Sequence, residues 1–108
     1  MAKYFNITSA TTTTLAQASD YTINSATNKR STNNVTISKI IVNNADDANA
    51  AISVWLDGTT DYYVISGLNV PAATTFVWDT PFTFNASTHT LKLTNTGGAS
   101  PVLYVILS

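Results

Sequence analysis

The chain lacks cysteine and glutamate, has a single histidine, His89, and carries few charges of either sign. Its 108 residues include five Lys or Arg, six Asp, four Gly and three Pro. Without cysteine there can be no disulfide bridge and no thiolate metal site. Acid–base catalysis and phosphate recognition draw on residue types that are scarce here, and His89 has no evident partner to orient it as a base. We therefore expect a structural histidine, no enzyme, no metal and no cofactor.

The weak charge also separates the chain from two classes of partner. The formal net charge is −1, and the basic residues are scattered apart from the adjacent Lys29 and Arg30. Such a chain has no electrostatic attraction to nucleic acid or to anionic lipid. No apolar stretch approaches the ~20 residues that cross a bilayer, and none is typical of a signal peptide. We expect synthesis in the cytoplasm and neither a nucleic-acid nor a membrane partner.

Threonine, asparagine and serine are abundant and account for 40 of the 108 residues. Threonine favours pleated strands, whereas asparagine and serine favour turns. From residue 35 onward, short alternating segments are separated by turn signals such as Asp57-Gly58 and Gly97-Gly98. This spacing predicts an all-β fold, an antiparallel β-sandwich of jelly-roll type. The predicted strands are 35–43, 51–57, 62–65, 68–70, 74–78, 82–84, 89–95 and 102–107.

The first third of the chain differs from the rest. Residues 1–34 have little periodic apolar signal, which predicts an extended N-terminal arm, with short strands at 4–8 and 21–23, before a β-sandwich domain over 35–108. The low charge of this stretch argues against disorder. An arm ordered against a neighbour and an ordinary edge strand followed by a long loop both fit the pattern.

Alternation assigns faces to the predicted strands. Ile52, Val54 and Leu56 share one face, and Trp55 lies on the other. The alternation breaks near Lys39, which indicates a bulge or a strand buried on both sides. The closing strand is apolar on both faces, which is typical of a sandwich centre or of a subunit contact. The predicted interface residues are Trp55, Tyr62, Tyr63, Leu103, Val105 and Leu107.

Two pairs of aspartates could suggest chemistry, but each has a simpler interpretation. Asp57 and Asp61 flank a short loop and offer too few carboxylates for calcium, so we interpret the segment as a hairpin. Asp46 and Asp47 are adjacent, and side chains of adjacent loop residues usually diverge. We expect one of them to cap a single helical turn through residues 48–51.

The aromatic residues carry the strongest functional signal. The aromatic residues at positions 55, 62, 63, 78, 82 and 84 cluster within thirty residues. Most are expected in the core, because a small sandwich needs large anchors. The outward Trp55 favours a protein interface, where aromatic anchors dominate. A sugar-stacking platform is the alternative.

Three segments resemble small β-sandwich structural proteins of tailed bacteriophages. They are residues 54–65 (VWLDGTTDYYVI), 68–78 (LNVPAATTFVW) and 91–95 (LKLTN), and the similarity covers about half of the chain. Such proteins often have glycine after the proline, where this chain has Ala72-Ala73. The family has no catalytic residue to carry over.

The resemblance implies a virion protein, made in the host cytoplasm, that acts as a capsid decoration (cement) protein. Its expected partners are the major capsid protein or other virion proteins and further copies of itself, assembled as a homotrimer. Two alternatives stay open from the sequence. One is an accessory protein of the phage neck or tail, and the other is a carbohydrate-binding module of a tail or fibre.

Overall fold

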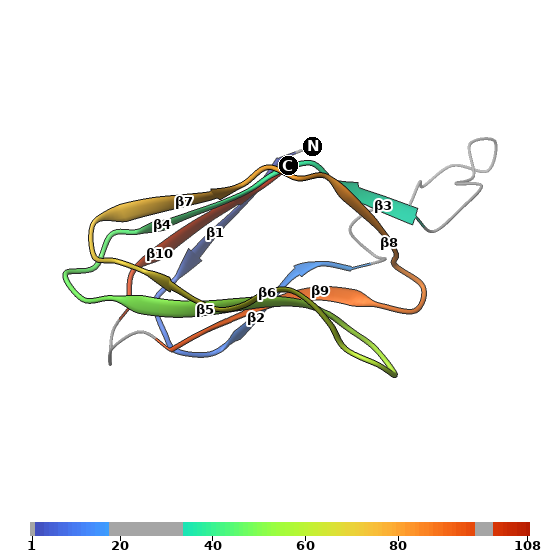
Figure 1. Ribbon diagram of the computed structural model, residues 1–108, viewed down its shortest axis with the longest axis horizontal. Coiled ribbons are helices and arrows are strands. Elements are labelled where there is room, and N and C mark those ends of the chain that lie inside the picture. Colours follow the sequence, from blue (N-terminus) through green and yellow to red (C-terminus); the bar gives the residue numbers. More distant parts are fainter. Residues whose placement is uncertain (1, 18–33, 97–100) are drawn as a thin grey trace.

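The computed structural model describes residues 2–17, 34–96 and 101–108, which form ten strands and no helix. Two four-stranded antiparallel sheets, β1-β10-β4-β7 and β2-β9-β5-β6, lie as two layers, and β3 pairs with β8 at one end (Figure 1). The predicted all-β antiparallel sandwich is confirmed. The strands are β1 (Lys3–Ile7), β2 (Thr12–Ala16), β3 (Asn34–Ile37), β4 (Ile40–Asn44), β5 (Ala50–Asp57), β6 (Tyr62–Val70), β7 (Thr74–Trp78), β8 (Phe82–Asn85), β9 (Thr90–Asn95) and β10 (Leu103–Leu107).

The strand pairs are nested from the ends of the chain toward its middle. β1 pairs with β10, β2 with β9, β3 with β8, β4 with β7, and β5 with β6. Two further ladders, β10–β4 and β9–β5, complete the sheets. A long hairpin rolled up on itself gives this order. The predicted jelly-roll connectivity stays a prediction, which the nested order supports.

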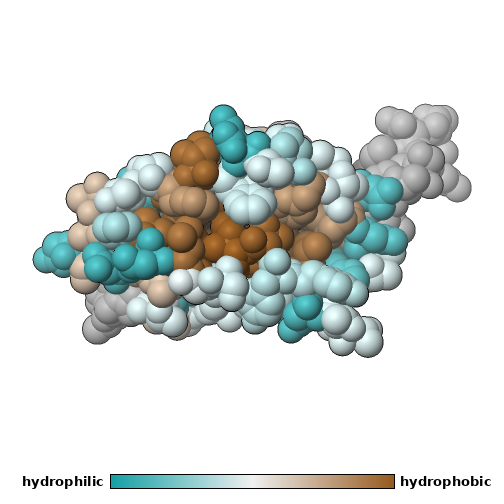
Figure 2. Space-filling model, in the orientation of Figure 1, coloured by the Kyte–Doolittle hydropathy of each residue, from teal (hydrophilic) through white to brown (hydrophobic). Residues whose placement is uncertain are grey.

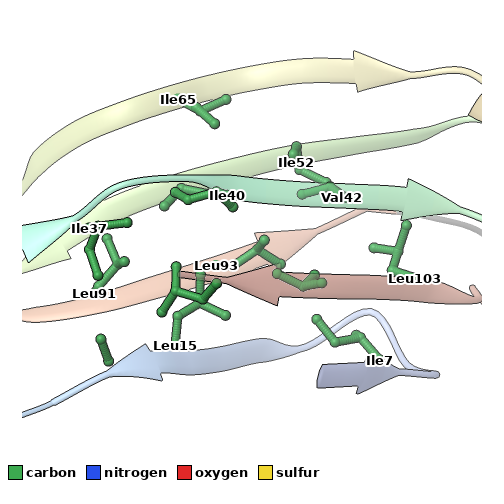
Figure 3. Packing of buried hydrophobic residues seen from close by; sticks show 14 of the residues in the cluster. Ile7, Leu15, Ile37, Ile40, Val42, Ile52, Ile65, Leu91, Leu93 and Leu103 are labelled. Carbon is green, nitrogen blue, oxygen red and sulfur yellow. The ribbon is translucent and has the colours of Figure 1, made fainter. Parts of the chain in front are cut away.

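The core lies between the two sheets, where alternate side chains of both layers meet (Figure 3). Full burial of one such aliphatic side chain stabilises the fold by about 1.5–3 kcal/mol. The pleat brings every second residue inward, so the apolar alternation of the sequence becomes one continuous cluster. Its largest fully buried members are Leu15, Ile37, Ile40, Val42, Ile52, Val54, Val70, Leu91, Leu93, Leu103, Val105 and Leu107.

The extended N-terminal arm predicted over residues 1–34 is not confirmed. β1 and β2 come from this stretch, and each is an edge strand of one sheet. Ile7, Leu15 and Ala16 are buried in the core. The sequence predicts β1 but misses β2, because the polar run of threonines hides the two inward residues at its end. The strand predicted at 21–23 lies outside the described residues.

Two other predicted strand boundaries are wrong. The strand predicted over 35–43 is two strands, because the backbone N–H groups of Ser38 and Lys39 both donate to the carbonyl of Ser108, at 2.7 and 3.2 Å. The alternation therefore breaks where the chain passes from the β3–β8 pair into the sheet of β4. Conversely, the strands predicted at 62–65 and 68–70 are one strand, β6, which continues through Gly67 at a φ of 62°.

Two buried asparagines hold the loops against the core. Asn44 is fully buried, and its side-chain amide donates to the carbonyls of Ala48 (2.9 Å) and Val70 (3.0 Å). Its side-chain oxygen accepts from the N–H of Asp46 at 3.1 Å. These bonds satisfy the loop between β4 and β5 without helix, so the predicted helical turn over 48–51 is wrong. Asn95 donates similarly to the carbonyl of Ser9 at 3.1 Å.

Candidate interaction surfaces

The outer face of the β1-β10-β4-β7 sheet carries an apolar row that crosses all four strands. The register places Tyr4 beside Ile106, Ile106 beside Ile41, and Ile41 beside Val77. Tyr4 is 76% exposed and Val77 is 47% exposed. Cross-strand neighbours on one face of a sheet lie about 5 Å apart. The row is therefore a continuous apolar strip open to solvent.

A second, mixed row runs beside the first. It consists of Asn6, Tyr104, Asn43 and Thr75, and the Asn43 amide donates to the Thr75 hydroxyl at 2.8 Å. None of the eight residues in the two rows is charged. We call this set of eight the uncharged face: Tyr4, Asn6, Ile41, Asn43, Thr75, Val77, Tyr104 and Ile106.

The uncharged face is hollowed at one end. A depression of about 290 Å³ lies over β1 and β10 and is lined by Tyr4, Phe5, Asn6, Tyr104, Val105 and Ile106. Tyr4 and Tyr104 stand diagonally across the two strands, with Ile106 beside Tyr4.

The outer face of the opposite sheet is different in character. Trp55 stacks on Tyr63 across β5 and β6, with ring centroids 5.7 Å apart and an interplanar angle of 26°. Lys92, the neighbour of Trp55 on β9, forms an ion pair with Asp57 at 2.7 Å. The hydrogen bond from Lys92 and its positive charge lower the pKa of Asp57 below its ordinary value. This face combines an aromatic pair with charge.

The structure divides the six predicted interface residues into two groups. Trp55 is half-buried, and Tyr62 and Tyr63 are 57% and 58% exposed, all at one end of the β2-β9-β5-β6 sheet. The other three are corrected: Leu103, Val105 and Leu107 are at most 1% exposed and pack in the core. They are the inward residues of β10.

The outward residues of β10, Tyr104 and Ile106, are the ones that sequence reasoning missed. The closing strand is apolar on both faces, and the sequence does not say which face the second sheet covers. Tyr4 was missed for a different reason, since its strand was assigned to an arm. The alternation in both segments could have indicated this face, because alternate residues of a strand lie on the same side: Tyr4 with Asn6, and Tyr104 with Ile106.

His89 joins two loops. Its Nδ1 lies 2.8 Å from the Thr88 hydroxyl, and its Nε2 lies 3.3 Å from the carbonyl of Thr60. Its ring also lies 5.6 Å from the ring of Tyr62. The imidazole thus packs the hairpin between β5 and β6 against the turn between β8 and β9.

The hairpin itself contains the aspartates that were considered as calcium ligands. Asp61 accepts a hydrogen bond from the N–H of Gly58 at 3.3 Å. In the part of the chain that the structure describes, no group of three or more His, Cys, Asp or Glu could hold a metal ion. Among those same residues, no helix is long and apolar enough to cross a membrane.

Comparison with known proteins adds little to this geometry. No protein-family model and no curated protein matches the chain. A chain from the structure of infectious bursal disease virus Gx strain aligns with a TM-score of 0.45 and 13% identity, over 99% of this chain and 32% of that chain. The chain therefore spans about a third of the length of that protein. A similarity this weak supports no functional inference.

Proposed function

We propose that the chain is a structural protein of a virus particle, a capsid decoration protein that binds the shell through the uncharged face. The observation that carries the proposal is the apolar row across that face, with none of its eight residues charged. The cores of protein interfaces are depleted in charge and enriched in tyrosine. The uncharged face has both properties.

The two exposed tyrosines are the expected anchors. Tyr4 and Tyr104 are 76% and 46% exposed and flank the depression. Truncation of a central aromatic anchor typically weakens binding by about 2 kcal/mol or more. A partner side chain that enters the depression would bury both rings together with Ile106. The major capsid protein is the expected partner.

The resemblance to small structural proteins of tailed phages supports the viral part of the proposal. The residues that carry it form β5 to β7 and β9 of the sandwich. A compact sandwich with eight uncharged residues on one outer face suits permanent contact with a surface. Such a role needs shape and apolar area rather than reactive groups.

The test uses particles of the virus that encodes the chain, prepared without it. Purified chain is added, and the copies bound per particle are counted by quantitative mass spectrometry after sedimentation. Ile106→Lys places a charge in the apolar row and should reduce binding at least tenfold. Thr94→Lys is the matched control, because Thr94 lies on β9 in the other sheet, and it should bind like wild type.

The copy number separates the proposal from its nearest alternative. A decoration protein follows the symmetry of the shell and is present in hundreds of copies, whereas a neck or tail accessory protein is present in about a dozen or fewer. Failure of the wild-type chain to bind would contradict the proposal. Equal binding of both lysine variants would remove the uncharged face from it.

One observation favours a second candidate, a carbohydrate-binding module of a tail or fibre. The stacked Trp55 and Tyr63 lie beside the Lys92–Asp57 ion pair. Aromatic rings stack on sugars, and the charged pair offers hydrogen bonds to hydroxyls. Glycan binding by the isolated chain that is lost in Trp55→Ala would establish this role, and absence of binding across a glycan array would exclude it.

A further inference from the structure

The four edge strands of the two four-stranded sheets are unequally protected against pairing with another chain. Natural proteins block exposed edges with inward-turned charges and bulges. β1 carries Lys3, whose ammonium donates to the carbonyl of Leu15 at 2.6 Å. The register of β2 shifts between Thr14 and Ala16. The register of β6 shifts twice against β5, and β6 contains Gly67 at a φ of 62°.

β7 has none of these devices. Its sequence, TTFVW, contains no charge, proline or glycine, and it pairs with β4 over five residues without a register shift. Among the described residues, no strand pairs with its other edge. Strand edges that are regular, uncharged and rich in β-branched and aromatic residues favour pairing with another strand.

The inward side of the same edge is incompletely covered. Phe76 and Trp78 of β7, with Val64 and Leu68 of β6, are only partly buried against the core. Figure 2 shows a band of apolar surface between the two layers. On the opposite margin, the Lys3 hydrogen bond joins the edge strands β1 and β2. Among the described residues, the β6–β7 margin has apolar side chains where the opposite margin has this hydrogen bond.

We propose that β7 pairs antiparallel with β7 of a second copy, centred on Phe76, to give one continuous eight-stranded sheet. This register places Phe76 opposite Phe76 of the second copy and Thr75 opposite Val77 of the second copy. It pairs all five residues and supplies about four to six backbone hydrogen bonds. The two-fold symmetry closes the assembly as a dimer.

A second copy fits this edge better than an unrelated strand. The two-fold sets the inward aromatic residues of one β7 beside those of the other, over the open margin. β7 bears no charge, so a charged partner strand would find no opposite charge to pair with. A second β7 is itself uncharged and needs no such partner. The two rows of the uncharged face would also continue from one copy into the other, since Val77 lies opposite Thr75 of the second copy.

The joined rows deepen the proposed function. Two uncharged faces would lie side by side on one sheet, and a shell could bind both at once, which raises avidity without a new kind of contact. The pairing itself does not depend on the shell. It is measured in solution, so its failure and failure of shell binding are separate results.

The test uses the absence of cysteine from the chain. Thr75→Cys combined with Val77→Cys should form a covalent dimer under mild oxidation, because directly opposed Cβ atoms lie about 4.5–5.5 Å apart, close to disulfide geometry. Thr75→Cys alone is the matched control. In the proposed register its two copies lie on a diagonal about 7–8 Å apart, so it should cross-link at least tenfold less.

Light scattering on the unmodified chain supplies the second measurement. The proposal expects a mass twice 11.5 kDa for the unmodified chain. The double variant Thr75→Lys/Val77→Lys should be a monomer. Tyr4→Lys places a charge at the far end of the same row and should remain a dimer. Circular dichroism checks that the variants fold. A monomer, a trimer, equal cross-linking in both cysteine variants, or dissociation by Tyr4→Lys would each overturn the proposal.

Discussion

A side chain at Gly58 should destabilise the fold, because the hairpin approaches His89 too closely. A Cβ at this position would lie 2.6 Å from His89 Cδ2, 2.8 Å from His89 Nε2 and 2.8 Å from the carbonyl oxygen of Thr88. Ordinary contacts begin near 3.4 Å. The imidazole could rotate away only by giving up its contacts with Thr88 and Thr60, and the Thr88 carbonyl belongs to the backbone. Overpacking of this kind costs about 1–3 kcal/mol.

Thermal unfolding of Gly58→Ala measures this cost. We expect Tm to fall by roughly 4–24 °C, since about 1 kcal/mol corresponds to roughly 4–8 °C in a domain of this size. His89→Ala should remove two of the three close contacts. The loss of stability in the double variant should therefore be smaller than the sum of the losses in the two single variants, by about 0.5 kcal/mol or more.

Gly67→Ala is the matched control. A Cβ at Gly67 meets nothing within 4 Å, so its cost comes from the positive φ alone. Its effect should add to that of His89→Ala without coupling. Unchanged stability in Gly58→Ala, or strict additivity with His89→Ala, would refute the structural role given to the histidine.

Three further predictions concern stability, each checked by denaturant or thermal unfolding. Asn44→Ala should cost about 1–3 kcal/mol with an unchanged m-value, because the buried carbonyl of Val70 loses the Asn44 amide as a donor; a smaller loss would mean that water replaces the amide. The pKa of Asp57 is lowered in the fold by Lys92. The ionised Asp57 therefore stabilises the fold slightly at a pH above its pKa in the unfolded chain, and this stabilisation is lost as the pH falls through its lower pKa in the folded chain. The Tm difference between wild type and Asp57→Asn should therefore shrink between pH 7 and pH 3 (about four units, spanning the ordinary carboxyl pKa), and a constant difference would contradict this. Ala73→Gly should stabilise the fold by up to about 1 kcal/mol, because Ala73 has a φ of 57°, and a destabilised variant would show that this φ carries no strain.

The position of Ala73 links the structure to the sequence resemblance. The phage proteins that the sequence resembles often have glycine in the loop after the proline, and this chain keeps the left-handed backbone at Ala73 without it. The strand pattern was predictable because alternation is a local property. The strands β5, β7, β9 and β10 follow their predicted ranges within one or two residues.

The uncharged face was not predictable in the same way. It is assembled from pairs as distant in sequence as Tyr4 with Ile106, and only the fold brings them into one row. The closing strand shows the limit most clearly. Its sequence is apolar at every position from 102 to 107, so choosing its inward side needs the second sheet. The predicted interface therefore included Leu103, Val105 and Leu107, whose side chains fill the core.

The proposed contact between the uncharged face and a viral shell can be tested directly by hydroxyl-radical footprinting of the chain, free and mixed with the particle. Tyr4 and Tyr104 are 76% and 46% exposed on the uncharged face, and Tyr62 and Tyr63 are 57% and 58% exposed on the other sheet. We predict that binding protects Tyr4 and Tyr104 and leaves Tyr62 and Tyr63 reactive. Protection of Tyr62 and Tyr63, with Tyr4 and Tyr104 unchanged, would contradict the assignment of the uncharged face.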